Sequence, residues 1–339
     1  MRVKSLIILF FVFAFCFKAR GQDPAFSQFF SSPLNVNPAL TGNINADWRM
    51  IANIRDQWIG PASPYMTGTI SYDTRLMRDK MSATPDKSTF GIGTMLMFDY
   101  AMSGIVKSTY ASLNLAYNIN LIDNYTSKHN LGVGFGAIYG RRYMDFTRVD
   151  WEEQFIGTGF NTSLPTGETA LSNMKPYISS SAGITYSIST DNSNIDFGVS
   201  AFHLNKPKQT FLEDENQYLA MRRVAHINFE TFLNESLVLN TNAIYQYQIG
   251  AKYFSVGGLI GYYLPYQEDL VLNAGMWYWS NNAIIPYVGL NYRDMQFGVS
   301  YDLTTSKLNQ ATRKPNTWEL SLIIRGERKP SGIIPCPWK

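Results

Sequence analysis

The stretch LVLNTNAIYQYQI, residues 237–249, alternates between two kinds of side chain. Odd positions hold Leu, Thr, Ala, Tyr and Ile, whereas even positions are mostly amides, among them Asn240 and Asn242. A period of two is that of a β-strand whose two faces meet different surroundings. Because the polar face carries Asn and Gln rather than Lys and Glu, the stretch predicts a strand with one face towards lipid and the other towards a polar lumen.

The same alternation recurs along the chain. Between Ala225 and Leu233, for example, His226 and Glu230 share the polar face with Asn228. The predicted strands lie near residues 47–59, 65–76, 88–101, 105–120, 129–142, 177–189, 194–204, 222–233, 236–249, 251–263, 269–279, 283–293, 294–303 and 316–326. These strands predict an all-β protein, a transmembrane antiparallel β-barrel of about 14 strands spanning residues 45–326. Their number is even, as in bacterial single-chain outer-membrane barrels.

Composition agrees with this fold class. Charged residues make up 16% of the chain and aromatic residues 14%, whereas average soluble proteins carry roughly 25% charged residues. No stretch after the N-terminus approaches the roughly 20 apolar residues of a membrane helix. The net charge of +3 is too small to indicate a nucleic-acid partner, so we expect membrane lipid and no nucleic acid around this protein.

The lengths of the connections indicate an orientation. If the first strand runs outward, the long connections 143–176, 205–221 and 304–315 all lie outside the cell. Most of the connections at the opposite end are short, as at residues 191–194 and 234–236. Long outer loops and short periplasmic turns are typical of outer-membrane barrels.

The first 21 residues have the pattern of a signal peptide. Arg2 and Lys4 precede the apolar run Leu6–Phe15, which is too short to span a bilayer. Small residues at positions 19 and 21 predict cleavage before Gln22. The alternative, lipid attachment at Cys16, requires a small residue where Phe15 stands.

Residues 22–44, between the signal peptide and the barrel, fit neither a helical nor a strand period. This segment is rich in Pro and Asn and carries Phe26, Phe29 and Phe30. Because exposing three aromatic rings to water is unfavourable, we predict that the segment folds into the periplasmic mouth as a partial plug anchored by these rings. The alternative is a disordered leader. At the other end, residues 327–339 are expected to form a periplasmic tail.

The inner face is predicted to carry few groups capable of chemistry. Its expected polar residues are Arg49, Arg55, His226, Glu230, Asn240 and Asn242. His226 and Glu230 form either a lumen pair or two separate lining residues. The three histidines show no metal-ligand spacing, and no nucleophile motif occurs, so we expect no enzyme, no metal and no cofactor. Alternate glycines such as Gly132 and Gly134 are expected to leave room inside the barrel.

The residues QDPAFSQFFSSPLNVNPALTGN, 22–43, resemble the N-terminus of the PorP/SprF family. The matching positions are Gln22, Pro24, Phe26, Ser27, Gln28, Asn37, Pro38, Ala39 and Gly42. The resemblance continues through RDQW at 55–58, FGVSAFHLNKP at 197–207 and the terminal IPCPWK at 334–339. At this terminus Trp338 precedes Lys339, whereas the family pattern has a basic residue before the aromatic one.

The resemblance implies an outer-membrane barrel of the type IX secretion system of Bacteroidetes. It implies a role in the secretion and cell-surface display of proteins, often large adhesins, that carry a type IX C-terminal signal domain. It also implies contact with the periplasmic secretion and gliding machinery. A FadL-type barrel that transports hydrophobic small molecules and a general porin are the alternatives.

A displayed partner needs surface outside the membrane, and the 143–176 loop offers aromatic side chains. Phe146, Trp151, Phe155 and Phe160 lie there among glycines and acidic residues, a mixture suited to an interface anchor ringed by polar groups. Alternatively, these rings fold the loop back over the mouth of the barrel.

Overall fold

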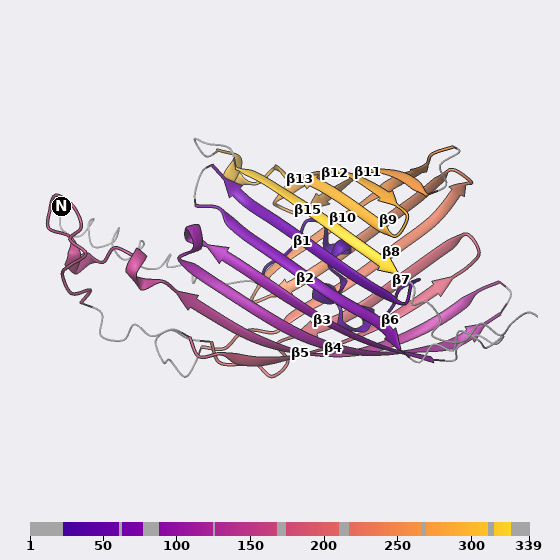
Figure 1. The fold of residues 1–339 in the computed structure, drawn as a ribbon, viewed down its shortest axis with the longest axis horizontal. Helices are drawn as coiled ribbons and strands as arrows, with labels where there is room; N and C mark the ends of the chain where they lie inside the picture. Colours follow the sequence, from indigo (N-terminus) through magenta and orange to yellow (C-terminus); the bar gives the residue numbers. More distant parts are fainter. Residues whose placement is uncertain are drawn as a thin grey trace, which may run out of the picture.

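The computed structural model describes residues 23–60, 63–76, 88–124, 126–167, 174–209, 217–265, 269–310 and 315–326. Within these residues the chain forms a closed antiparallel barrel of 14 strands (Figure 1). The predicted signal peptide at 1–21 and the predicted tail at 327–339 lie outside the described residues. Among the described residues, no helix is long and apolar enough to cross a membrane.

The strands agree with the predicted ranges to within a few residues. They are β1 Trp48–Ile59, β2 Tyr65–Leu76, β3 Ser88–Ala101, β4 Val106–Asp123, β5 Lys128–Met144, β6 Tyr177–Ser189, β7 Ser193–Phe202, β8 Arg222–Asn234, β9 Leu237–Gln248, β10 Ala251–Tyr263, β11 Leu270–Trp279, β12 Ala283–Tyr292, β13 Met295–Tyr301, β14 Leu303–Thr304 and β15 Asn316–Gly326. The predicted strand at 294–303 is divided into β13 and β14, because Asp302 interrupts it.

From β1 to β13 each strand pairs with the next, β13 pairs with β15, and the short β14 pairs with β12. β1 pairs with β15 to close the barrel, with Ile54 opposite Leu320. The predicted alternation is confirmed along the wall. Outward side chains are apolar and exposed, such as Phe135 (63%) and Val288 (67%). Inward side chains, such as Asn53 and Asn114, are polar and buried. This arrangement suits a wall between lipid and a polar interior.

The two ends of the barrel differ in their connections. At one end, which we call the loop end, β5 is joined to β6 by residues 145–176 and β7 to β8 by residues 203–221. At the other end, the turn end, residues 190–192, 235–236 and 293–294 join successive strands. The loop end is the one expected outside the cell.

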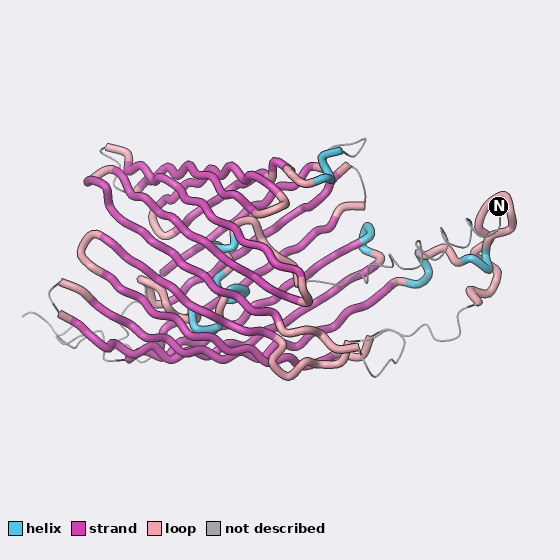
Figure 2. Tube along the Cα trace, turned by 180° about the vertical axis from the view of Figure 1, so that it is seen from behind, coloured by secondary structure: helices cyan, strands magenta, loops and turns pink. Residues whose placement is uncertain are grey.

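A segment without strands precedes β1 and lies inside the barrel, as Figures 1 and 2 show. We call residues 23–43 the N-terminal segment. It contains three short helical turns, η1 Phe29–Ser31, α2 Pro33–Val36 and η2 Pro38–Leu40. The other short helices lie in connections and are η3 Met102–Gly104, η4 Phe146–Arg148, η5 Glu152–Gln154 and η6 Lys307–Gln310.

The closed hydrogen-bonded wall predicts how the protein migrates in electrophoresis and what circular dichroism spectrum it gives. The protein purified in detergent should migrate differently in electrophoresis before and after boiling, because the barrel stays folded until heated. Its circular dichroism should be dominated by β-structure. Substantial helix in the spectrum would contradict the fold.

Candidate functional site: the lumen and the loop end

The N-terminal segment crosses the lumen from one end to the other. Near the loop end, the backbone N–H of Asp23 donates to Gln248, the last residue of β9. Near the turn end, the N–H of Gly42 donates to Asp73 of β2 at 2.9 Å. The segment was expected only at the turn end, but it extends through the lumen to the loop end, because inward polar groups offer partners along the whole length of the wall.

Asp23 holds the start of the segment at the loop end. Its carboxylate lies 2.8 Å from His203 and 3.2 Å from Arg222, and the side-chain amide of Gln248 donates to it. Burial would raise the pKa of Asp23, but the charge of Arg222 and the hydrogen bonds of His203 and Gln248 outweigh burial and hold the pKa below its usual range. Arg222 also lies over the ring of Phe202, with 4.1 Å to its centroid.

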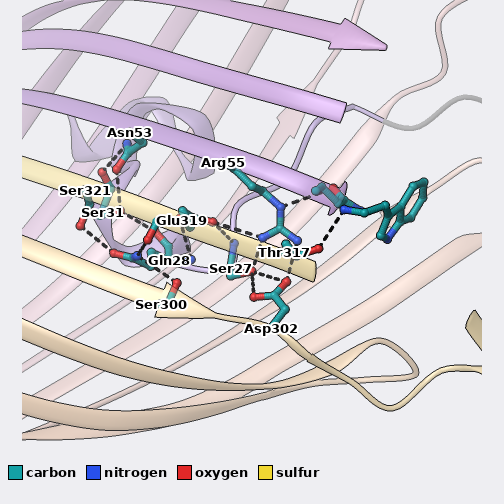
Figure 3. Close-up of polar contacts among 12 residues, drawn as sticks. Ser27, Gln28, Ser31, Asn53, Arg55, Ser300, Asp302, Thr317, Glu319 and Ser321 are labelled. Carbon is teal, nitrogen blue, oxygen red and sulfur yellow. Dashed lines mark hydrogen bonds and ion pairs between the residues drawn. The ribbon is translucent and has the colours of Figure 1, made fainter. Parts of the chain in front are cut away.

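Ser27 and Gln28 bind the wall more closely (Figure 3). Their backbone N–H groups donate to the two carboxylate oxygens of Glu319, at 2.8 and 3.0 Å. The Gln28 amide donates to Ser300 and accepts from the hydroxyl of Ser321. Gln28, which is 1% exposed, thus uses both ends of its side-chain amide.

Arg55 lies at the centre of this network. Its guanidinium is 2.8 Å from Asp302 and 3.2 Å from Glu319, and all three side chains are almost fully buried. It also contacts the hydroxyl of Ser27, which donates to Asp302 at 2.8 Å. One cation faces two carboxylates here, so the N–H groups of the segment supply the remaining stabilisation of negative charge.

Phe26, Phe29 and Phe30 enter apolar regions within the lumen. Phe26 packs with Leu34 of the segment and with Met95 of β3. Phe29 belongs to a larger cluster that includes Phe202, Val224, Ile244, Leu259 and Trp277. Phe26 and Phe29 are buried, whereas Phe30 is half-buried.

Phe30 lies against two aromatic residues of the wall. It stacks on Trp277 with ring centroids 4.7 Å apart and meets Tyr287 edge-on at 5.6 Å. The indole N–H of Trp277 donates to Asn242 at 2.6 Å. The polar inner face therefore also orients the aromatic residue on which Phe30 rests.

Asn37 joins the segment to the far wall. Its amide nitrogen lies 3.2 Å from the carbonyl oxygens of Ile184 and Val199 and 3.1 Å from the imidazole of His226. His226 therefore contacts the segment. Glu230 instead accepts from Asn240 at 3.2 Å, and no bond between His226 and Glu230 occurs among the described residues. Of the two arrangements considered, the structure has separate lining residues.

Two inward glycines allow the backbone of the segment to approach the wall. A methyl group built on Gly134 would overlap the backbone of Pro38 and Ala39, and one built on Gly91 would overlap the carbonyl of Thr41. Neither collision can be relieved by rotating a side chain. Glycine is thus required where backbone meets backbone.

Arg49 secures the end of the segment at the turn end. Its guanidinium makes two hydrogen bonds to Asp73, at 2.8 and 3.0 Å, and a third to the carbonyl of Leu40. Asp73 also receives the N–H of Gly42, so one buried carboxylate holds both the first strand and the segment that leads into it.

Cavities border the N-terminal segment at both ends of the described barrel. One, of about 710 Å³, lies at the loop end and is lined by Asp23, Ala25 and Trp279 among others. The second, of about 340 Å³, lies at the turn end and is lined by Phe30 and Arg325 among others. Residues of the segment contribute to both linings.

The aromatic residues of the 145–176 connection form two pairs. Phe146 and Trp151 are half-buried and lie 6.4 Å apart. Phe155 and Phe160 pair across an antiparallel bridge with ring centroids 5.2 Å apart, and they are 52% and 50% exposed. The described part of this connection reaches away from the barrel rather than across its mouth (Figure 1).

Sequence reasoning missed several residues of the lumen. Asp302, Glu319 and Gln28 belong to the buried network, although no spacing connects them in the chain. The one local signal is Asp302 itself, a single acidic residue near the end of the predicted strand 294–303. Within the described residues, no group of three or more His, Cys, Asp or Glu side chains is placed to hold a metal ion.

A closed barrel with an apolar exterior and a polar interior defines an outer-membrane β-barrel protein. Residues 19–324 match the family described as "Type IX secretion system membrane protein PorP/SprF". The match covers most of the chain, and the chain belongs to this family. A search of curated proteins gives no match.

Several solved barrels are distantly similar in structure. The toluene transporter TbuX of Ralstonia pickettii is 10% identical, with a TM-score of 0.48 over 87% of this chain and 94% of the transporter. The toluene transporter TodX of Pseudomonas putida is 11% identical, with a TM-score of 0.49 over 86% and 92%. A Pseudomonas aeruginosa FadL homologue is 13% identical, with a TM-score of 0.41 over 85% and 92%.

Arg55 gives a test of the buried network. Arg55→Met should lower the free energy of unfolding by about 3–5 kcal/mol, because it leaves Asp302 and Glu319 buried without a cation. Unfolding by guanidinium in detergent measures this loss. The matched control is Arg293→Met, which removes an exposed pair with Asp269 and should cost about 1 kcal/mol or less. Equal losses in the two variants would show that the buried pair is not what stabilises the barrel.

Proposed function

We propose that this outer-membrane barrel binds and displays secreted, adhesin-like surface proteins that carry a type IX C-terminal signal domain. Membership of a type IX secretion family supports the proposal. The strongest structural support for display of a partner is the exposed apolar tip of the 145–176 connection. The turn end is proposed to face the periplasmic secretion and gliding machinery, in the outer membrane of a Bacteroidetes-like bacterium after signal-peptide cleavage.

The tip of this connection has the features of an interface anchor. Phe155, Ile156 and Phe160 are each half or more exposed. Gln154, which is 4% exposed, holds the tip in shape. Its side chain donates to the carbonyl of Leu164, and its backbone carbonyl accepts from the N–H of Asn161. A supported apolar tip surrounded by polar groups can bind a partner with little ordering cost.

The docking test uses Phe155 and Phe160. Trp151 is less suitable than sequence alone suggested, because its side chain is half-buried and its ring lies against that of Phe146 within the loop. The double variant Phe155→Ala/Phe160→Ala should release the secreted partner into the medium, since the two exposed rings supply its apolar contact. Immunoblots of medium and cell surface measure the release, and barrel abundance should stay unchanged.

Tyr218→Ala provides the matched control. Tyr218 is 51% exposed and belongs to another long connection at the same end, residues 203–221. The partner should stay on the surface in this variant. Surface retention in the double variant as well would place docking in the lumen or at the turn end, contrary to the proposal.

We further propose that the N-terminal segment occludes the lumen, with Phe26, Phe29 and Phe30 as its anchors. The contacts of these rings with the wall support this proposal. Occlusion would keep a secretion-associated barrel from leaking small solutes. A general porin, in contrast, requires an open path for ions through the intact protein.

Deletion of residues 22–42 tests occlusion. The shortened barrel should fold, since the strand ladder does not include the segment, and its conductance in planar bilayers should rise severalfold above that of the intact protein. Heat-modifiable migration of the variant checks folding. Equal conductance of the two proteins would contradict occlusion, and a high conductance of the intact protein would favour a porin.

A further inference from the structure

The cavity of about 340 Å³ at the turn end combines apolar and polar walls. Phe29 and Phe30 of the N-terminal segment, with Leu259 of β10, supply apolar surface. Asn273, Asn291 and Gln296 supply amides from neighbouring strands. A cavity of this size and mixed lining is typical of a site for a small amphipathic ligand.

Arg325 is the distinctive group of this cavity. It faces inward from β15, directly opposite Arg49 of β1. The charge of Arg49 is balanced by Asp73 at 2.8 Å. The side chain of Arg325 donates to Gln296 at 3.1 Å, and among the described residues no carboxylate lies within ion-pair distance of it. Two like charges opposite each other, with one balancing carboxylate, leave this side of the cavity electropositive.

The acidic residues of the cavity lie across the lumen on β7 and β8 and have other partners. Asp196 accepts from the hydroxyl of Ser187 and from the amide of Asn194. Glu230 accepts from Asn240. The cavity is therefore polarised. On one side lies the guanidinium of Arg325, which has no carboxylate within ion-pair distance among the described residues, and on the other lie hydrogen-bonded carboxylates, of which Glu230 interacts with Arg325 only at longer range.

We propose that this cavity binds a monocarboxylate attached to an apolar body. The carboxylate pairs with the guanidinium of Arg325, whose planar N–H groups match a carboxylate. The apolar body lies on Phe29, Phe30 and Leu259. A multiply charged anion such as a phosphate dianion fits less well, because Asp196 and Glu230 line the same cavity. A fatty acid and the C-terminus of a polypeptide ending in an apolar residue both present this chemistry.

Calorimetric titration of the full-length protein in detergent tests the site without any substitution. The probes are octanoate and its neutral analogue octanamide, and acetyl-Ala-Leu with a free or an amidated C-terminus. At least one of the two acids should bind about tenfold or more tightly than its amide, because only the acid carries the charge that pairs with Arg325. The acid that binds more tightly identifies the source, fatty acid or polypeptide. Equal affinity of acid and amide in both pairs, or no binding of either acid, overturns the proposal.

Substitutions of Arg325 test whether the ligand binds in this cavity. Arg325→Gln should remove the preference for the acid, whereas Arg325→Lys should retain most of it, since the charge is kept. Arg293→Gln is the matched control, because Arg293 lies at the same end but is 65% exposed and paired with Asp269. A preference that survives Arg325→Gln in a protein with normal heat-modifiable migration would overturn the assignment to this cavity.

Discussion

Arg55 places one positive charge between the carboxylates of Asp302 and Glu319 inside the barrel, and the arrangement of the lumen depends on this contact. Removing charged groups from water raises the free energy of the folded protein unless each charge has a partner of opposite charge or hydrogen-bond donors and acceptors around it. The wall alone provides one cation for two anions, and the N–H groups of Ser27 and Gln28 complete the set. The buried network therefore requires the N-terminal segment as much as the segment requires the wall.

The same reasoning explains why the segment extends through the lumen rather than ending at one mouth. Polar partners occur at both ends, with Arg222 near the loop end and Asp73 near the turn end. Apolar residues such as Trp277 hold the rings between them. The close approach at Gly134 adds a steric condition, because no other residue leaves room for the backbone there. The segment thus fits this barrel through charge, apolar contact and shape together.

Much of the wall could be predicted from the sequence, because a barrel strand shows its two environments in its own residues, as residues 237–249 do. The arrangement of the lumen could not be predicted in this way. Gln28 and Ser300 are far apart in the chain, and nothing in either neighbourhood indicates that they meet. For the same reason the partner of His226 proved to be Asn37, a residue of the segment, and not Glu230 from its own strand. Local periodicity predicts which face a side chain occupies, whereas its partner depends on the closed fold.

Thiol labelling tests most directly whether the N-terminal segment is buried in the lumen of the folded protein. Ser31 is 0% exposed within the segment, whereas Ser163 lies exposed on the long connection at the loop end. In a Cys336→Ser background, Ser31→Cys and Ser163→Cys are each treated with a water-soluble maleimide in detergent. A segment buried in the lumen predicts rapid labelling at position 163 and labelling at position 31 only after heat unfolding. Labelling of position 31 in the folded protein at the rate of position 163 would contradict burial of the segment.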